Sequence, residues 1–543
     1  MKRFKLFLAM AALACAIGLT VKYGSTYRPV VEPVREIEEI WALEDAREES
    51  GEPLVTRLFC NGIPMAYDAE NNVFYGSLGL ENGAQWPEIK LTASDEAAKG
   101  LSLCFADDYG FDDCDAAIRE GYSYQIFAYT DTAYSYAEVV FTGLPLVNVT
   151  AEQTIEREDV PAQIEIALAA EGMQTNGRIH KRGGASILND KVGYKLEFTR
   201  TTDGKKKIYR EIPGMGTDSQ VILLPMNALD TTMMRDRLSW ALYARLTRRD
   251  EPFSARKTQY CELFLNGEYR GVYLMLEPFS VRQEVAKAGE ERLTTDSVYR
   301  TAVISLSHGR PCMEDPYSAA TGFELYYPMD GEPDFSPLAD YFALLGETDD
   351  AAFMRRAAQI IDLDSALRYD VVLQLFGLTD NVINNMYTWA QNSRGHTRYR
   401  FDFWDLDVSW GLKRDEIGEM HENWVFFPLV DRLLRADEEG GVRKRYGEIY
   451  REVREKAFDA ETVEALVGQY AHELNDSGAM ARNADRWETE NYTADGYELV
   501  AFAAERIALL DEPVRAMSAG EEIDLRFLEK TNYDDKGTPL TEE

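Results

Sequence analysis

Oxygen-bearing side chains recur in two neighbouring segments of the chain, at a spacing suited to phosphoryl transfer. Asp380 is followed five positions later by Asn385, and Asp405 ends an apolar, strand-like run that starts at Phe401. In enzymes that move a phosphoryl group, one Asp orients the acceptor hydroxyl, while an Asn and a second Asp hold the divalent ions on the nucleotide phosphates. The spacing alone is a weak signal, because an Asp at position 380 can instead cap a helix and an Asp at position 405 can instead close a turn at the end of a strand.

The same oxygen donors are suited to a nucleotide-bound magnesium or manganese ion. Magnesium takes few oxygens from the protein and completes its shell with phosphate oxygens and waters. The amide of Asn385 and the carboxylate of Asp405 form such a sparse set. No two of the five His residues have metal-ligand spacing on a helix, and no Gly-x-Ser-x-Gly motif occurs. Zinc-hydrolase and serine-hydrolase chemistry is therefore disfavoured.

Charge is unevenly distributed along the chain. Acidic residues outnumber basic ones by 94 to 58, which gives a formal net charge of −36. Nucleic-acid phosphates would be repelled, so nonspecific DNA or RNA binding is disfavoured. Between Arg178 and Arg210, however, ten cationic residues face three acidic ones. This segment predicts either a local site for an anion such as a polyphosphate or an exposed pair of basic strands.

The N-terminus has the pattern of a targeting segment. Three basic residues accompany an apolar run from Leu6 to Val21, which is short for a membrane-spanning helix. Residues 1–21 are therefore predicted to be a signal peptide or a membrane anchor, with lipidation or cleavage near Cys15 left open. Each alternative places the rest of the chain outside the cytoplasm, either secreted or anchored in a bacterial cell envelope.

Patterning divides the rest of the chain into segments. Its 543 residues suffice for roughly two to four domains. Residues 22–50 are polar and are predicted to be a stalk. Residues 51–149 alternate short apolar runs with turn signals, which predicts a small all-β, sandwich-like accessory domain. Residues 150–515 begin with strands and a helix expected over residues 231–246, and they end in helices; residues 516–543 form an acidic tail.

The order of elements in residues 150–515 predicts an α+β fold with two lobes. Asn266-Gly267 separates two apolar runs and is a strong hairpin signal. Strands and one helix thus precede this hairpin, and a helical region that carries Asp380 and Asn385 follows it. A nucleotide is expected in the cleft between the two lobes.

The six cysteines lack the spacing of a structural zinc site. Cys104 and Cys114 flank a turn-rich segment and are candidates for a disulfide, while the others within the folded part are expected to be buried thiols.

From about residue 150 to 515 the chain resembles the spore-coat protein H (CotH) kinase family. Four motifs carry this resemblance, and they occur in the order found in the family. The motifs are Arg182-Gly183-Gly184-Ala185-Ser186 with Lys191 and Tyr194; Asp230 with Arg235 and Asp236; Glu262 to Gly267 with Gly271 to Glu277; and Asp380 to Asn385 with Trp404 to Asp407, Trp410 and Gly411.

The resemblance implies an atypical protein-kinase-like domain. Its expected activity is transfer of the γ-phosphoryl group of ATP, with Mg²⁺ or Mn²⁺, to Ser or Thr of a protein substrate. By position in the motifs, Asp380 is the catalytic Asp and Asn385 is a metal ligand. Asp405 is the metal-binding Asp, with Asp407 as the competing assignment.

Three further residues are expected to hold the nucleotide. The resemblance implies that Lys191, rather than Lys195, contacts a phosphate and that Glu277 lies near the hinge that holds adenine. Arg182 can bind a phosphate through two hydrogen bonds, and a structural ion pair is an equal alternative. The chain departs from the family at Gly184-Ala185, where Asn-Ser is usual, and so lacks two polar side chains there.

Several neighbouring charged residues have structural interpretations. Arg235 and Asp236 are expected to pair with nearby groups, Glu262 to face solvent, and Asp402 to face outward or form an ion pair. An extracytoplasmic location also favours a second hypothesis, because ATP is scarce outside cells. Under that hypothesis the chain is a non-catalytic envelope or surface binding protein on a kinase-like scaffold. Phosphoryl or nucleotidyl transfer to a small molecule or sugar is a weaker third hypothesis.

Overall fold

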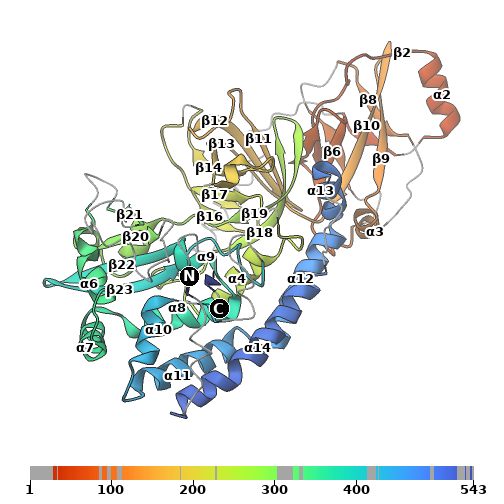
Figure 1. Ribbon diagram of the computed structural model, residues 1–543. Helices are drawn as coiled ribbons and strands as arrows, with labels where there is room; N and C mark the ends of the chain where they lie inside the picture. Colours follow the sequence, from red (N-terminus) through yellow and green to blue (C-terminus); the bar gives the residue numbers. More distant parts are fainter. Residues whose placement is uncertain are drawn as a thin grey trace, which may run out of the picture.

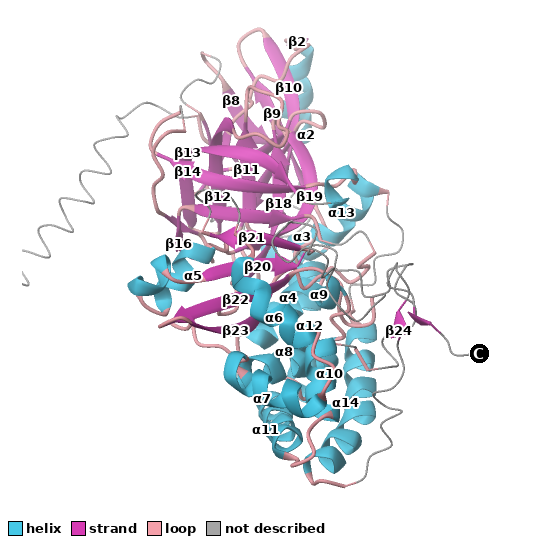
Figure 2. Ribbon diagram, turned by 60° about the vertical axis from the view of Figure 1, so that its left-hand side comes forward, coloured by secondary structure: helices cyan, strands magenta, loops and turns pink. Residues whose placement is uncertain are grey.

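The computed structural model describes residues 29–33, 35–84, 89–94, 99–106, 113–183, 185–202, 204–226, 229–301, 322–328, 334–412, 424–425, 427–488, 495–521, 532–533 and 539–540. These residues form a mixed α+β fold, as predicted, with strands in the upper part of Figure 2 and most helices in the lower part. The predicted leader, residues 1–21, lies outside the described residues. No helix in the described part is long and apolar enough to cross a membrane.

The N-terminal part consists of a seven-stranded and a three-stranded sheet that enclose a common apolar core. Phe74 and Ile126 of the larger sheet lie in this core with Leu58 of the smaller one. The elements are β1 (Val31–Glu32), α2 (Ile37–Asp45), β2 (Glu48–Glu49), β3 (Leu58–Cys60), β4 (Ile63–Pro64), β5 (Ala66–Asp68), β6 (Val73–Ser77), β7 (Leu91–Ala93), β8 (Ser102–Phe105), α3 (Cys114–Arg119), β9 (Ser123–Tyr129) and β10 (Ala133–Thr142).

The predicted stalk, residues 22–50, is from residue 29 onward part of this domain. Strand β1 pairs with β8, and β2 pairs with β10. Ile40 of α2 is fully buried against Cys104 and Phe127. The polar composition of the segment concealed this anchor, and with α2 and α3 the domain is not all-β.

Cys104 and Cys114 do not form the disulfide that their spacing suggested. Both are buried thiols, as are Cys60 and Cys261. Cys104 packs in the cluster beneath α2, whereas Cys114 packs in the core between the two sheets. The two sulfur atoms therefore belong to different apolar clusters.

A closed barrel follows, with strand order β11-β12-β13-β14-β17-β19-β18. Neighbouring strands are antiparallel, except that β11 and β18 close the barrel in parallel. Because β11 begins at Leu146, the barrel starts slightly before the predicted boundary at residue 150. The elements are β11 (Leu146–Thr150), β12 (Val160–Leu168), β13 (Glu171–Arg182), a 3₁₀ turn (Ala185–Leu188), β14 (Gly193–Thr199), β15 (Arg210–Ile212), β16 (Gly216–Asp218), β17 (Gln220–Leu224), α4 (Arg235–Tyr243), β18 (Thr258–Leu265) and β19 (Glu268–Leu276).

The sequence predicted a hairpin and a helix in this region. The hairpin is confirmed: β18 and β19 pair on either side of Asn266 and Gly267, both with positive φ. Helix α4 is shorter than the expected residues 231–246. The Asp230 carboxylate accepts hydrogen bonds from the backbone N–H groups of Thr232 and Arg235, both at 3.1 Å. A turn organised by Asp230 thus precedes the helix.

The C-terminal part combines a four-stranded sheet, β21-β20-β22-β23, with helices. One large apolar core joins this sheet, the helices, α4 and one side of the barrel. The elements are α5 (Val281–Lys287), a 3₁₀ helix (Glu290–Thr294), β20 (Ser297–Thr301), β21 (Phe323–Tyr327), a 3₁₀ turn (Ser336–Leu338), α6 (Ala339–Leu345), α7 (Asp350–Ile360), α8 (Leu363–Phe376), α9 (Asp380–Ile383), β22 (Met386–Ser393), β23 (His396–Phe403), α10 (Pro428–Arg435), α11 (Gly441–Lys456), α12 (Ala460–Asp476), α13 (Ala479–Trp487), α14 (Tyr497–Ser518), β24 (Asn532–Tyr533) and β25 (Pro539–Leu540).

Helices α12 and α13 connect the three parts, running from the helical region past the barrel to the N-terminal domain (Figure 1). Arg482 of α13 pairs with Glu262 of β18 at 2.8 Å, and Tyr269 donates to the same carboxylate at 2.7 Å. Tyr75 of the N-terminal domain packs against Tyr269, with ring centres 5.8 Å apart. Glu262 is fully buried, so the expectation that it faces solvent is wrong. The strand alternation identified a face, but the apolar neighbours of that face come from another domain.

Candidate active site

Asp380 and Asn385 lie on the tight connection between α8 and β22. Helix α8 ends at Gly377, whose φ of 65° reverses the chain, and α9 begins at Asp380. Asn385 has a φ of 58°, a conformation that Asn adopts more readily than most residues. The turn brings Asn385 Nδ2 to 2.8 Å from one Asp380 oxygen and Asn384 Nδ2 to 3.1 Å from the other. The Asp380 carboxylate, 3% exposed, is thereby held in one orientation.

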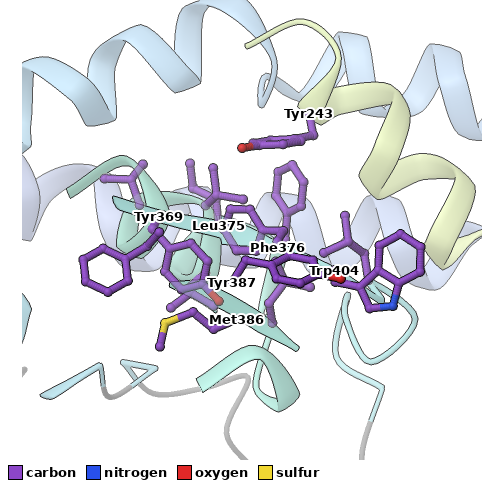
Figure 3. Packing of buried hydrophobic residues seen from close by; sticks show 14 of the residues in the cluster. Tyr243, Tyr369, Leu375, Phe376, Met386, Tyr387 and Trp404 are labelled. Carbon is purple, nitrogen blue, oxygen red and sulfur yellow. The ribbon is translucent and has the colours of Figure 1, made fainter. Parts of the chain in front are cut away.

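Asn381 and Trp404 tie this turn to the segment that follows β23. The backbone N–H of Trp404 donates to the Asn385 carbonyl at 3.0 Å, and Asn381 Nδ2 donates to the Trp404 carbonyl at 2.7 Å. The Tyr369 hydroxyl donates to the Asn381 carbonyl at 2.7 Å. Tyr369 and Trp404 belong to the cluster of buried hydrophobic residues shown in Figure 3. Because Asp405 follows Trp404 directly, these bonds hold it beside the Asn385 turn.

Asp405 and Asp407 share their surroundings with Asp236 of α4. Asp405 has a φ of 58°, so the chain turns sharply at the end of β23. The Leu406 backbone N–H donates to the buried Asp236 carboxylate, and burial, followed by repulsion from Asp407 and Asp405, raises the pKa of Asp236 well above its ordinary value. Three carboxylates thus converge from two distant segments.

Arg182 brings a positive charge to these carboxylates from the barrel. It is the last residue of β13, and its guanidinium carbon lies 6.0 Å from the centre of the Trp404 ring. Burial lowers the pKa of Arg182, and attraction from Asp405 and then Asp236 opposes this effect. Arg182 therefore lies within electrostatic reach of the carboxylates, where it can meet an anion bound beside them.

The carboxylates fit a nucleotide-bound divalent cation. Asp236 Oδ1 is buried and has no hydrogen-bond partner among the described residues, and the neighbouring negative charges of Asp405 and Asp407 repel it. A cation beside them relieves both costs. Within the described ranges, no group of three His, Cys, Asp or Glu side chains is placed to hold a metal by itself. Asn385 and Asp405 would hold the cation, and it would neutralise phosphate charge there.

Lys191 is engaged elsewhere. Its ammonium group donates to the Val272 carbonyl and to Asn483 Oδ1, the latter at 3.0 Å, and lies 5.0 Å from the centre of the Tyr273 ring. Burial lowers the pKa of Lys191 to about 7. These contacts fasten α13 to the barrel, and they give no support to the phosphate contact that the resemblance implied.

Glu277 follows β19, where the resemblance places a hinge. Its carboxylate pairs with Arg249 at 2.5 Å and accepts a hydrogen bond from the Lys257 backbone N–H at 3.1 Å. The adenine contact remains a prediction for this residue.

Sequence patterns assigned no role in the site to Asp236 or Asn381, and the expectation for Asp402 was wrong. Asp236 was interpreted as structural, yet it faces Asp405 and Asp407. Asn381 stood inside the Asp380 motif without a role. Asp402 was expected to face outward or form an ion pair, but it accepts a hydrogen bond from the Tyr243 hydroxyl at 2.9 Å, and burial raises its pKa to about 7. Alternation along β23 placed Asp402 on the opposite face from Phe401 and Phe403, and Tyr243 of α4 covers that face.

Comparison with known proteins gives one result at the level of the family. A family model described as CotH kinase protein matches residues 179–510, which is more than half of the chain. No curated protein matches the chain. The matched span starts within β13 and ends within α14, so it contains Arg182, Asp236, Asp380 and the segment after β23. The chain belongs to the CotH kinase protein family.

Proposed function

We propose that the chain is an atypical protein kinase that transfers the γ-phosphoryl group of ATP to Ser or Thr of extracytoplasmic, coat or envelope proteins. Membership of the CotH kinase protein family supports a kinase-related function. The observation that carries the proposal is the joining of Asp380, Asn385 and the Trp404–Asp405 segment by hydrogen bonds at one turn. The barrel and the helical part would form the two lobes, with the nucleotide between them.

Each side chain has a role that its surroundings suit. Asp380 accepts a hydrogen bond from the substrate hydroxyl and takes its proton late in the transfer. Asn385 and Asp405 bind the cation, with Asp407 as the competing assignment for the second ligand. Arg182 binds phosphate oxygens from the barrel side. A Mg²⁺ or Mn²⁺ ion held by Asn385 and Asp405 would supply positive charge to the phosphoryl group.

The location outside the cytoplasm belongs to the same proposal. Its support is the basic and apolar pattern of residues 1–21. The protein substrate would be reached outside the membrane, and the net charge of −36 makes a basic protein surface a better partner than a nucleic acid.

One observation favours a second candidate, a non-catalytic binding protein on the same scaffold. Of the two cations expected to contact phosphate, Lys191 is occupied by Val272 and Asn483. The motif after Arg182 also lacks the polar side chains usual in the family. A chain of this kind would retain the fold while binding nucleotide weakly.

Phosphoryl transfer from γ-labelled ATP separates the two candidates. The purified chain is incubated with Mg²⁺ or Mn²⁺ and a basic test protein, myelin basic protein, and labelled Ser or Thr is identified by mass spectrometry. The kinase proposal expects labelling of the test protein or of the chain itself, lost in Asp380→Asn. If neither protein is labelled, and Mg²⁺–ATP and Mn²⁺–ATP leave the melting temperature unchanged, the binding-protein candidate stands instead.

A further inference from the structure

A cavity of about 350 Å³ lies between α4, the loop that leads from α4 to β18, and α12. Its lining contains four cationic residues, and no Asp or Glu lines it among the described residues. Such a concentration is unusual in a chain with a net charge of −36, because acidic residues elsewhere outnumber basic ones. The four are Arg237, Arg249, Arg256 and Lys257. Three of the four pair with carboxylates outside the lining: Arg237 with Glu473, Arg249 with Glu277 and Arg256 with Glu284.

Two residues in the cavity wall carry buried hydrogen-bond donors without partners in the described structure. Arg256, 7% exposed, leaves Nε and Nη2 unpaired, and Trp240, 2% exposed, leaves Nε1 unpaired. Buried donors of this kind are nearly always satisfied in folded proteins, and a charged donor is the costliest to leave alone. Because both residues line the cavity, an acceptor bound there can satisfy these N–H groups.

The cations are held in place before any ligand arrives. Arg256 donates through Nη1 to Glu284 at 3.0 Å and lies 4.9 Å from the centre of the Phe279 ring. Arg237 lies between Tyr260 and Tyr470, 4.3 Å from each ring centre. Fixed donors lose little conformational entropy on binding, which favours affinity.

Helix α4 separates the cavity from the carboxylate site. Trp240 lines the cavity and packs against Trp404, with ring centres 6.4 Å apart. Asp236, one turn earlier on α4, faces Asp405 and Asp407. The residues placed at the carboxylate site do not line the cavity.

We propose that this cavity binds a small phosphorylated anion at a site distinct from the carboxylate site. Arg256 and Trp240 donate to its oxygens from the wall. The exposed Lys257 and Arg249, the latter paired with Glu277, lie at the mouth. The volume lies within the range of about 300–1,000 Å³ typical of small-molecule sites. A phosphate group suits the planar fork of an arginine better than a neutral ligand does.

Titration calorimetry of the purified chain with pyrophosphate, in EDTA and without nucleotide, tests the proposal. Saturable binding is expected, weakened by added salt. Ala244→Glu places a carboxylate on the exposed cavity wall, and the double variant Arg249→Gln, Lys257→Gln removes two charges from the mouth. Each is expected to weaken binding by about tenfold or more, the loss of roughly one charge-assisted hydrogen bond. Arg249→Gln also breaks the partly exposed ion pair with Glu277, so unchanged melting temperatures are required to verify the fold.

Arg248→Gln is the matched control. Arg248 is exposed, pairs with Asp250 and lies beside Arg249 in sequence, but it does not line the cavity. Binding unchanged in Arg248→Gln and in Arg182→Met supports the proposal, because Arg182 is the cation expected to meet an anion at the carboxylate site. This outcome does not depend on kinase activity.

Three outcomes overturn the proposal: absence of pyrophosphate binding, equal weakening in Arg248→Gln, and loss of binding in Arg182→Met. If pyrophosphate does not bind but a phosphoserine peptide does, the first of these outcomes points to a protein partner.

Discussion

Asn385 donates from Nδ2 to Asp380 at 2.8 Å, and its backbone carbonyl accepts from the N–H of Trp404 at 3.0 Å. One residue thus links the expected catalytic carboxylate to the segment that carries Asp405. Because the amide nitrogen is used by Asp380, the amide oxygen is the atom suited to a cation. The positive φ of Asn385 is the local cost of this geometry.

Two substitutions of Asn385 separate its role as a metal ligand from the strain of its backbone conformation. Both Asn385→Gly and Asn385→Ala remove the amide, so both are expected to lose the melting-temperature increase produced by Mg²⁺–ATP. Asn385→Ala also places a Cβ in a left-handed conformation without the local hydrogen bonds of Asn, at about 1 kcal/mol or more. Urea unfolding should therefore show Asn385→Ala to be less stable than Asn385→Gly. Nucleotide binding that survives in Asn385→Gly contradicts the ligand role.

Arg182 and Lys191 are expected to respond differently to loss of charge. Arg182→Met should weaken nucleotide binding by about tenfold or more, since it removes a charge-assisted contact. Lys191→Met should leave nucleotide binding within about twofold of the parent chain, because the ammonium group serves Val272 and Asn483. Fluorescent-nucleotide titration measures both. If Lys191→Met loses nucleotide binding instead, Lys191 contacts a phosphate as the family resemblance implies, despite its contacts with Val272 and Asn483.

Glu262 is expected to be a major determinant of stability. It is fully buried and bonded to Arg482 and Tyr269. Glu262→Ala leaves the Arg482 charge buried and uncompensated, which typically costs about 3–5 kcal/mol. Chemical unfolding of Glu262→Ala measures this loss, and Asp250→Ala, which breaks the exposed pair with Arg248, is the control with a cost of about 0–1 kcal/mol. Equal costs for the two variants would show that the buried pair does not join the barrel to α13.

Asp370 should make the folded chain less stable as pH rises. Burial raises the pKa of Asp370 to about 7, and it accepts a hydrogen bond from the Tyr446 hydroxyl at 2.7 Å. The unfolded chain releases this proton near pH 4. Between about pH 4 and 7 the folded state therefore holds the extra proton, and the free energy of unfolding falls by up to about 1.4 kcal/mol per pH unit from this group.

Asp370→Asn is expected to remove that part of the pH dependence and to gain stability over the parent chain from pH 5 to pH 8. Urea unfolding at several pH values measures it. Asp364→Asn is the control: Arg445 lowers the pKa of the exposed Asp364, so its contribution is lost below about pH 4 and is constant from pH 5 to pH 8. An unchanged slope in Asp370→Asn contradicts the protonated state of this buried carboxyl.

Elements that are specified by neighbouring residues in the sequence were predicted correctly. The hairpin at Asn266-Gly267 followed from the turn that these residues favour, and the α+β class followed from the order of strand and helix patterns. Domain edges were less predictable. Residues 29–50 look polar in sequence, and the burial of Ile40 depends on Phe127, far along the chain.

The local motif of the site could be predicted from the sequence, but the distant residues that surround it could not. The bond between Asp380 and Asn385 spans five positions, so spacing alone can suggest it. The approach of Asp236 to Asp405 requires α4 to pack against the segment after β23, which no local pattern specifies. Likewise, the ammonium group of Lys191 meets Asn483 only because α13 lies against the barrel. Contacts between segments that are distant in sequence are decided by tertiary packing.

The central claim is that Asn385 and Asp405 together bind the metal of a nucleotide. The most direct measurement is anomalous diffraction from crystals of the chain with Mn²⁺ and a non-hydrolysable ATP analogue. The account predicts a manganese peak within bonding distance of the Asn385 amide oxygen and an Asp405 carboxylate oxygen. A manganese–nucleotide complex bound away from these two side chains would contradict it.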